Sequence, residues 1–279
     1  MKTGNKITLL YTLLITIIMV GAALIYHTQM SSSHKSIFLG IAILAFFSVL
    51  VFIAGKLLYA RMINRMDDAI GNEKAFISNA SHELNNPLTA IQGECEISLK
   101  KDRDIEEYKL SLRTIESETE RIIGLMRNLL FLSRGDKEIL KNEMETVCLT
   151  DFLLQFVNER VHLNQDNFAF TFRANSHLIK TAIGNIIDNA LKYSGNKPVE
   201  LWVEDNTLTI KDEGIGIPPE DLKMIFHPFF RASNVRGFGG RGIGLSLSHR
   251  ILEAYKAKMK ITSEIGKGTT VIIDFPMRS

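Results

Sequence analysis

The chain has 279 residues, of which 46% are apolar, and its 33 Lys and Arg residues nearly balance its 31 Asp and Glu residues. This length allows about two domains together with accessory segments. The charge balance leaves no basic surplus typical of nucleic-acid binding and no acidic tail typical of a disordered segment. We therefore expect no nucleic-acid partner.

Two uncharged stretches near the N-terminus, residues 7–26 and 37–55, are each long enough to cross the roughly 30 Å hydrocarbon core of a bilayer as a helix. A cleaved signal peptide is the alternative for the first stretch. The second stretch follows so soon that it favours a two-helix transmembrane hairpin over residues 1–56. Basic residues flank the pair, which predicts a multi-pass protein of the inner (cytoplasmic) membrane with both ends in the cytoplasm. These residues are Lys2, Lys6, Lys56, Arg61 and Arg65.

The two cysteines, Cys95 and Cys148, fall in the part predicted to be cytoplasmic. Because that compartment is reducing, we expect no structural disulfide. The spacing of Cys and His also shows no zinc-type cluster.

Helical patterns continue after the second apolar stretch. Residues 57–72 predict a juxtamembrane signalling helix, and two longer patterns at 73–99 and 105–133 predict a helical hairpin within a domain spanning 73–135. The second of these helices carries an apolar seam with alternating spacings of four and three, typical of left-handed supercoiling. Because a lone hairpin buries such a seam poorly, we predict a homodimer that forms a four-helix bundle. The seam consists of Tyr108, Leu112, Ile115, Thr119, Ile122, Met126 and Leu129.

The pattern changes over residues 147–279, where short strand-like runs alternate with helical segments. This alternation predicts a compact α/β sandwich with a mixed sheet. The expected strands are 168–172, 199–203, 208–211, 260–263 and 270–275, and the expected helices are 178–192 and 243–254.

The helix around His82 has an unusual composition. Helical periodicity gathers its apolar side chains on one face and places His82 on the opposite, exposed face, with Asn86 one turn later. An ordinary exposed histidine is the alternative. Two neighbouring residues favour a catalytic role for His82 instead. Pro87 removes a helix hydrogen bond, and Glu83 is a carboxylate partner for the imidazole. A neutral histidine with a pKa near about 6.5 is a competent nucleophile when a carboxylate orients it.

Three further motifs are suited to a nucleotide. Asn185 and Asn189 share one helix face, where amide oxygens suit Mg²⁺, and Lys192 would neutralise phosphate charge. The alternative is a polar stripe on an amphipathic helix. Asp212 begins a glycine-containing turn and could accept a hydrogen bond from an adenine amino group, although a plain turn is the alternative. The glycine-rich residues 237–244 lead into a helix and predict a phosphate cradle that is neither a Walker A loop nor a Rossmann fingerprint.

Residues 81–88, Ser-His-Glu-Leu-Asn-Asn-Pro-Leu, resemble the H-box of the phosphoacceptor domain of sensor histidine kinases. The resemblance implies that His82 accepts a phosphoryl group, that Glu83 acts as the base and that Asn86 orients water when the partner's phosphoryl group is hydrolysed. Asn85 replaces the usual basic residue and Asn86 the usual threonine. The second replacement keeps a hydrogen-bonding side chain.

The order of the later motifs resembles the N, G1, F, G2 and G3 boxes of the histidine-kinase ATPase domain, which has the Bergerat fold. The resemblance implies ATP and Mg²⁺ as cofactors, Asn189 as the metal ligand, and residues 231–241 as a mobile lid. The implied ATP-binding residues are Asn185, Asn189, Lys192, Tyr193, Asp212, Gly214, Gly216, Phe230, Arg231, Gly240, Gly242, Gly244, Leu245 and Thr269.

Together these resemblances imply a membrane-bound histidine kinase that autophosphorylates and then transfers the phosphoryl group to an aspartate of a response regulator. Two other classes stay open: a chaperone-type or topoisomerase-type ATPase, and a membrane scaffold that only binds nucleotide. An ATPase of the first kind needs a general-base carboxylate where this chain has Asn185. The ten residues between the apolar stretches are too few for a ligand-binding domain. Sensing would then take place in the membrane, at its surface or through a partner, unless the hairpin is merely an anchor.

Overall fold

The computed structural model describes residues 21, 32–140, 143–165, 170–235 and 237–276. The chain divides into two compact units, Met1–Ala75 and Phe76–Ser279. Apart from Gly21, the first predicted membrane stretch, residues 7–26, lies outside the described residues.

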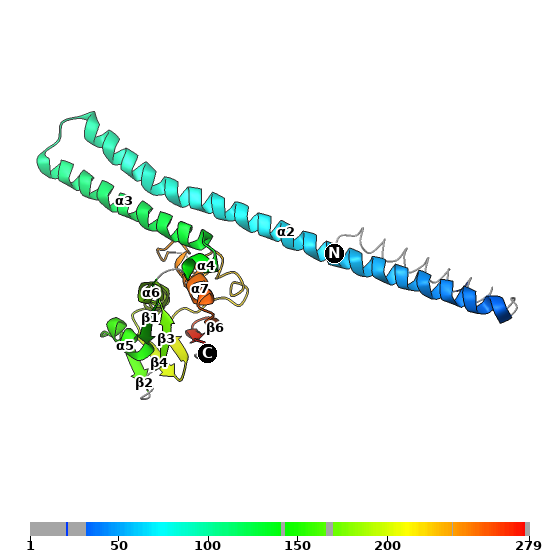
Figure 1. Cartoon of the computed structure of the whole chain (residues 1–279). Helices are drawn as coiled ribbons and strands as arrows, with labels where there is room; N and C mark the ends of the chain where they lie inside the picture. Colours follow the sequence, from blue (N-terminus) through cyan, green and yellow to red (C-terminus); the bar gives the residue numbers. More distant parts are fainter. Residues whose placement is uncertain (1–20, 22–31, 141–142, 166–169, 236, 277–279) are drawn as a thin grey trace. The chain divides into compact units, whose positions relative to one another are not determined.

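A single helix of 69 residues, α2 (Ser32–Lys100), runs without interruption through Pro87 (Figure 1). Within the described residues, one stretch is long and apolar enough to cross a membrane, and it covers Ala45–Ile63. This stretch overlaps the predicted span at 37–55. Because the helix is continuous over both ranges, the backbone does not mark where a span ends. The described residues therefore support one candidate span, and the first predicted span stays a prediction.

The second helix of the hairpin, α3 (Ile105–Ser133), confirms the predicted bounds 105–133. Asp104 caps its N-terminus, where the carboxylate accepts a hydrogen bond from the Glu107 backbone N–H at 2.8 Å. A short helix, α4 (Asp136–Ile139), follows. The polar turn between α2 and α3 therefore ends in a residue that caps the N-terminus of α3.

The predicted seam on α3 is only partly covered within one chain. Ser111 and Leu125 are the buried residues of this helix, so the face covered inside the chain is displaced from the predicted seam. Ile115, Ile122 and Leu129 of the seam are half-buried, whereas Tyr108, Leu112 and Met126 are exposed. A hairpin of two helices covers one side of each helix, which leaves the other apolar side open.

The second half of the chain contains a five-stranded sheet with the order β2-β4-β5-β7-β6. Strand β2 runs parallel to β4, and the other neighbours are antiparallel, which confirms the predicted mixed sheet. Its strands are β2 (Val161–Gln165), β4 (Val199–Glu204), β5 (Thr207–Lys211), β6 (Lys258–Glu264) and β7 (Gly268–Asp274). A separate antiparallel pair joins β1 (Glu145–Cys148) and β3 (Thr171–Ala174).

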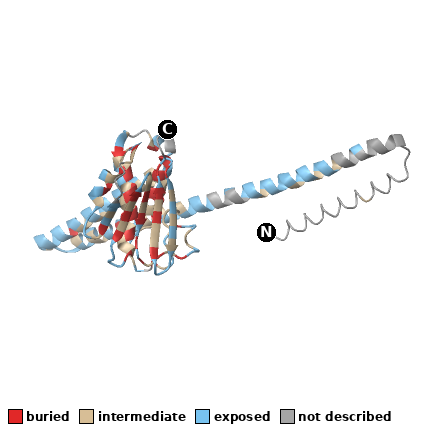
Figure 2. Cartoon of the chain, turned by 90° about the horizontal axis from the view of Figure 1, so that it is seen from below, coloured by how far each residue is buried: buried red, intermediate tan, exposed pale blue. Residues whose placement is uncertain are grey.

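Helices α6 (Ser176–Tyr193) and α7 (Gly244–Ala254) pack against each other and against the sheet. Figure 2 shows that the buried residues concentrate in this α/β region, whereas the described side chains of α2 are mostly exposed. The apolar face of α6 supplies much of this core through Ile179, Ala182, Ile183, Ile186, Ile187 and Ala190. Its opposite face is thereby left free to carry polar side chains.

Sequence patterns missed the short elements of this region: β1, β2, α5 (Leu149–Leu153) and the 3₁₀ turn η1 (Leu154–Phe156). Strand β2 lies at the sheet edge, and its polar side chains His162 and Asn164 are exposed. Both contact Glu200 on β4. Five residues with two outward polar positions do not make a strong strand pattern. The segment forms a strand because it pairs with β4.

Candidate functional site

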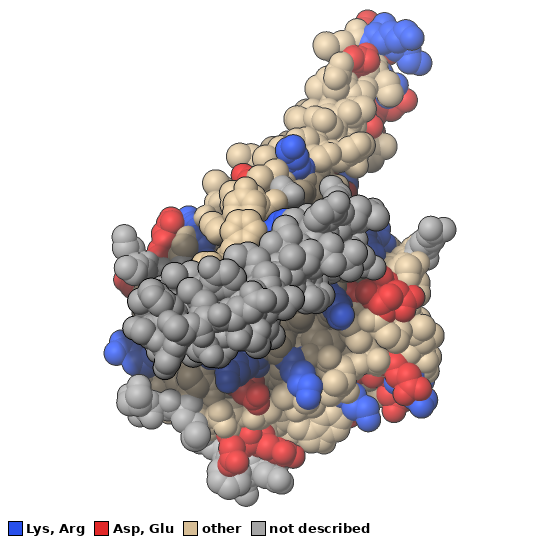
Figure 3. All heavy atoms as spheres, turned by 90° about the vertical axis from the view of Figure 1, so that its right-hand side faces the viewer, with Lys and Arg blue, Asp and Glu red and all other residues tan. Residues whose placement is uncertain are grey.

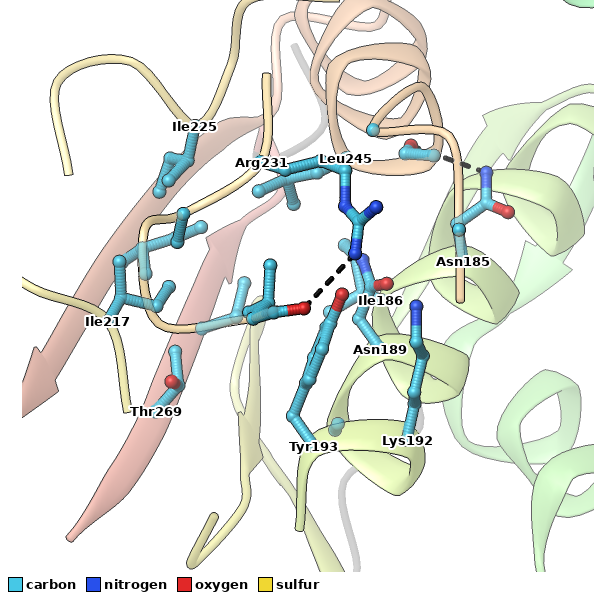
Figure 4. A pocket seen from close by; sticks show the side chains of 18 of the residues that line it. Asn185, Ile186, Asn189, Lys192, Tyr193, Ile217, Ile225, Arg231, Leu245 and Thr269 are labelled. Atoms are coloured by element: carbon cyan, nitrogen blue, oxygen red, sulfur yellow. Dashed lines mark hydrogen bonds between the residues drawn. The ribbon is translucent and has the colours of Figure 1, made fainter. Parts of the chain in front are cut away.

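A cavity of about 360 Å³ opens between α6, the loop that follows β5 and the loop that precedes α7 (Figure 4). The structure brings thirteen of the fourteen predicted nucleotide residues to its walls. These are Asn185, Asn189, Lys192, Tyr193, Asp212, Gly216, Phe230, Arg231, Gly240, Gly242, Gly244, Leu245 and Thr269. Gly214 does not line the cavity and instead lies behind Asp212.

Asp212 is buried, and its Oδ1 accepts hydrogen bonds from the backbone N–H groups of Gly214 at 2.8 Å and Thr269 at 3.2 Å. Burial raises the pKa of Asp212, and the two N–H donors oppose that rise. A Cβ at Gly214 would lie 2.2 Å from the carbonyl oxygen of Tyr193, so only glycine lets the turn approach α6 this closely. Since Oδ1 is engaged by the backbone, Oδ2 is the oxygen suited to accept a hydrogen bond from a ligand.

The cavity around Asp212 has apolar walls that sequence motifs did not identify. They come from α6, from the strands and from the loops that follow β5, and this composition suits a flat apolar ring. The residues are Ile186, Ile210, Ile215, Ile217, Ile225, Ile261 and Val271. The alternation of β5 and β7 marks their inward positions, but only the folded sheet shows which of them meet at this cavity.

The polar wall comes from α6, where Asn185, Asn189 and Lys192 project on one side of the helix (Figure 4). The Asn185 amide donates to the carbonyl oxygen of Gly244 at 3.4 Å, which ties α6 to the start of α7. Among the described residues there is no cluster of three or more His, Cys, Asp or Glu side chains that could hold a metal ion. Amide oxygens fit Mg²⁺, which accepts few protein ligands when phosphates and waters complete its shell.

The segment predicted as a lid, residues 231–241, lies across this wall. The Arg231 guanidinium donates to the carbonyl of Phe238, and the Lys192 ammonium donates to the carbonyl of Gly239. The Tyr193 and Phe238 rings meet with their centroids 5.2 Å apart. The side chains predicted to bind nucleotide therefore also hold this segment.

The glycine loop before α7 is joined closely to the phenylalanines that precede the lid. Gly242 has φ +71°, and a Cβ there would lie 2.5 Å from the carbonyl oxygen of Phe230. The Phe229 N–H donates to the Gly242 carbonyl at 2.8 Å. At Gly240 a Cβ would lie 2.6 Å from the Lys192 ammonium. Glycine at 242 therefore allows the close approach to the Phe230 backbone, and glycine at 240 keeps space open beside the Lys192 ammonium.

His82 and Asn86 are exposed on α2, as the helical periodicity predicts, and neither lines the cavity. Glu83 is half-buried, and its Oε2 lies 3.7 Å from Nε of Arg241. Arg241 belongs to the glycine loop and also lines the cavity. The structure thus connects the helix of His82 to the cavity through a charged pair that the sequence did not predict.

An aromatic contact also joins α2 to the α/β domain. The ring of Phe76, six residues before His82, has its centroid 5.8 Å from that of Phe229. Asn128 of α3 also lines the cavity. No motif in the sequence identifies Asn128, since its helix position says nothing of the α/β domain folded against it.

The fold and the cavity together define a class of protein. In this class, a helical hairpin with an exposed histidine is followed by an α/β sandwich whose cavity suits a nucleotide. Residues 72–138 match the model of the His Kinase A (phospho-acceptor) domain. Residues 174–279 match the model described as histidine kinase-, DNA gyrase B- and HSP90-like ATPase.

A curated relative is the signal transduction histidine-protein kinase ArlS of Staphylococcus aureus (strain USA300), which is 33% identical over 235 residues. The match covers 78% of this chain and 52% of ArlS, so the chain spans about half the length of the curated relatives it matches. Taken with the two domain matches in this order, this relationship shows that the chain belongs to the sensor histidine kinase family.

Two solved structures share the fold. The Acinetobacter baumannii histidine kinase AdeS has a TM-score of 0.50 and 24% identity, covering 71% of this chain and 98% of that one. Full-length ShkA in complex with AMPPNP has a TM-score of 0.51 and 20% identity, covering 70% of this chain and 44% of ShkA.

Proposed function

We propose that this chain is a membrane-bound sensor histidine kinase that autophosphorylates His82 from ATP and passes the phosphoryl group to an aspartate of a response regulator. The observation that carries the proposal is one compact unit, Phe76–Ser279, holding both an exposed histidine beside a carboxylate and the cavity formed by the nucleotide motifs. The working division is a two-helix membrane hairpin at 1–56, a signalling helix at 57–72, a dimerisation and phosphoacceptor domain at 73–135 and an ATP-binding domain at 147–279.

In the proposed binding mode, Asp212 accepts a hydrogen bond from the adenine amino group while the isoleucine walls cover the ring. Lys192 and the backbone N–H groups at the start of α7 face the phosphates. Asn189, with Asn185 one turn earlier, would hold Mg²⁺, which neutralises phosphate charge when it is bound. The apolar walls and the buried Asp212 fit a nucleobase, and the lysine beside the glycine loop fits an anion.

In the transfer step, the unprotonated ring nitrogen of His82 forms a bond to the γ-phosphorus. The bond from this phosphorus to the bridging oxygen breaks, and ADP leaves with that electron pair. The proton on the other ring nitrogen goes to Glu83, which yields a neutral phosphoimidazole. The protein's contribution is mainly positioning and charge stabilisation.

A homodimer is part of this proposal, because a second hairpin would cover the apolar side of α3 that one chain leaves open. The phosphorylated histidine would then serve a response regulator that docks on the hairpin. Asn86, exposed one turn after His82, is proposed to orient water for dephosphorylation of that regulator. If the Asn86→Ala variant dephosphorylates the regulator as fast as the wild type, this role is wrong.

Membrane anchoring in the inner membrane is supported by the apolar stretch Ala45–Ile63, whose described side chains are largely exposed to the surroundings of the helix. A multi-pass topology remains a prediction. On the face shown in Figure 3, basic and acidic side chains are interspersed over the described residues, which supports the expectation that nucleic acid is not a partner.

The test uses the full chain in lipid nanodiscs with ATP labelled at the γ-phosphate. We expect acid-labile, base-stable label in the wild type and none in His82→Ala, while both bind a non-hydrolysable ATP analogue equally. A wild type that binds the analogue but acquires no label would exclude a kinase and favour a nucleotide-binding scaffold. Release of phosphate without labelled protein would favour an ATPase.

A further inference from the structure

Arg241 connects two parts of the molecule that the proposed chemistry must bring together. Its backbone belongs to the loop Gly240–Gly242 that lines the cavity, and its guanidinium reaches out to α2 and α3. Nε lies 3.7 Å from Oε2 of Glu83, and Nη1 donates to the carbonyl oxygen of Arg121 at 3.4 Å. The side chains of Arg241 and Glu83 are only 25% and 28% exposed, so this contact is largely shielded from water.

The surrounding charges leave Glu83 as the principal anion for this guanidinium. Glu118 is already paired with Arg121, with 3.3 Å between its Oε2 and the Arg121 Nη1. Burial lowers the pKa of Arg241 and the charge of Arg121 adds to the effect, while Glu83 and Glu118 oppose it. Arginine nevertheless stays protonated in proteins. Arg241 is therefore a partly desolvated cation held mainly by one carboxylate.

The residue before Arg241 lies beside Lys192, the cation expected to meet phosphate. Gly240 lies so close to the Lys192 ammonium that a Cβ there would be 2.6 Å from Nζ. A triphosphate in the cavity carries several negative charges, and a guanidinium binds phosphate oxygens in a bidentate manner. A single carboxylate, 28% exposed, is a weaker partner for that guanidinium than several phosphate oxygens.

From this geometry we infer that Arg241 is a positioning residue that exchanges Glu83 for the phosphate chain of the nucleotide. Before nucleotide binds, Arg241 holds the carboxylate next to His82 in an ion pair. When phosphates take the guanidinium, Glu83 is released to act as the base toward His82. The inference rests on the proposed function and adds that nucleotide binding itself frees the base.

The test measures affinity, because affinity does not depend on phosphoryl transfer. Using the full chain in nanodiscs, a non-hydrolysable ATP analogue and adenosine are titrated into wild type, Glu83→Gln, Arg241→Met, Arg241→Lys and the two double variants. Since Glu83→Gln removes the competing carboxylate, we expect this variant to bind the analogue about 2–5-fold more tightly, the range that corresponds to the loss of one partly exposed ion pair. This gain should persist with Lys at 241 and vanish with Met, while adenosine affinity stays unchanged throughout.

Matched controls are Glu96→Gln on α2 and Arg113→Met on α3, whose side chains lie outside the cavity and are expected to leave both affinities unchanged. If Glu83→Gln leaves the analogue affinity unchanged, or if the gain survives in Arg241→Met, the exchange does not occur, even though the kinase proposal stands. If the wild type binds no nucleotide, both the exchange and the proposed function fail.

Discussion

The α/β domain and the helical hairpin use their apolar residues in opposite ways. In α6, six of 18 residues are buried, and they pack on a sheet from the same chain. In α3, two of 29 residues are buried, and several large apolar side chains remain exposed. The first region buries its apolar face largely on its own sheet, with Phe131 and Leu132 at the end of α3 packed against it, whereas the second leaves an apolar surface of the kind that a second copy could cover.

The largest effect is expected when a buried side chain is truncated in the core of the α/β domain. Ile183→Ala removes a side chain with 0% exposure from α6 and should cost about 2–5 kcal/mol of stability. Trp202 on β4 is the only tryptophan of the chain, so its fluorescence during urea unfolding reports on this domain. The control Ile123→Ala on α3, where the side chain is 44% exposed, should leave that transition in place. Equal shifts for both variants would show that the two regions unfold as one.

A charged residue on the exposed apolar seam of α3 should instead weaken the association of two hairpins in the proposed dimer. Leu112→Glu changes a leucine that is 63% exposed in the single chain, and losing both copies should weaken a dimer by roughly 3 kcal/mol. Subunit exchange between differently labelled chains in nanodiscs measures this loss. Leu154→Glu, at an exposed leucine of the α/β domain, is the control and should exchange like the wild type. Unchanged exchange in Leu112→Glu would place the dimer contact elsewhere.

Within the α/β domain, Asp212→Asn should separate binding from stability. The amide oxygen still accepts from Gly214 and Thr269, but its NH₂ group opposes an adenine amino group. The expected cost is about 1.5–3 kcal/mol of nucleotide affinity by calorimetry. An unchanged affinity for ATP would show that Asp212 does not contact the base.

The raised pKa of Asp212 also sets a pH dependence. Because the folded protein holds this proton more tightly, the stabilising contribution is present below the ordinary pKa of 3.8 and is lost as pH rises through the raised value. Wild type should therefore lose stability relative to Asp212→Asn across that window, as followed by Trp202 fluorescence. A pH-independent difference between the two proteins would contradict this.

The smallest effect concerns glycines in the two regions. A Cβ at Gly124 of α3 would meet no atom within 4 Å, so Gly124→Ala should stabilise the helix by about 0.5–1 kcal/mol, visible as slower amide exchange. Gly214→Ala should instead lower the stability of the α/β domain, because its Cβ would press on the Tyr193 carbonyl. If both variants were more stable than the wild type, the predicted difference between the two glycine positions would be wrong.

Patterns with strong periodicity could be predicted from sequence. The bounds of α3, the mixed sheet and the exposure of His82 all follow from regular spacing of apolar residues. Short elements such as β2 could not be predicted, because so few residues carry little pattern and strand pairing decides them. The ends of the membrane span stay a prediction for a related reason, since the continuous helix α2 has no internal boundary.

The chemical groups of this protein and the helix face on which each lies could be read from the amino-acid order, because helical spacing is a local property. Only the tertiary structure decided that Asn128 of α3 faces the cavity and that Arg241 contacts Glu83. Arg241 lies 158 positions after Glu83 in the sequence, and no local pattern relates them. Contacts of this kind depend on how the hairpin and the α/β domain pack against each other. The proposed coupling between nucleotide and histidine arises from that packing.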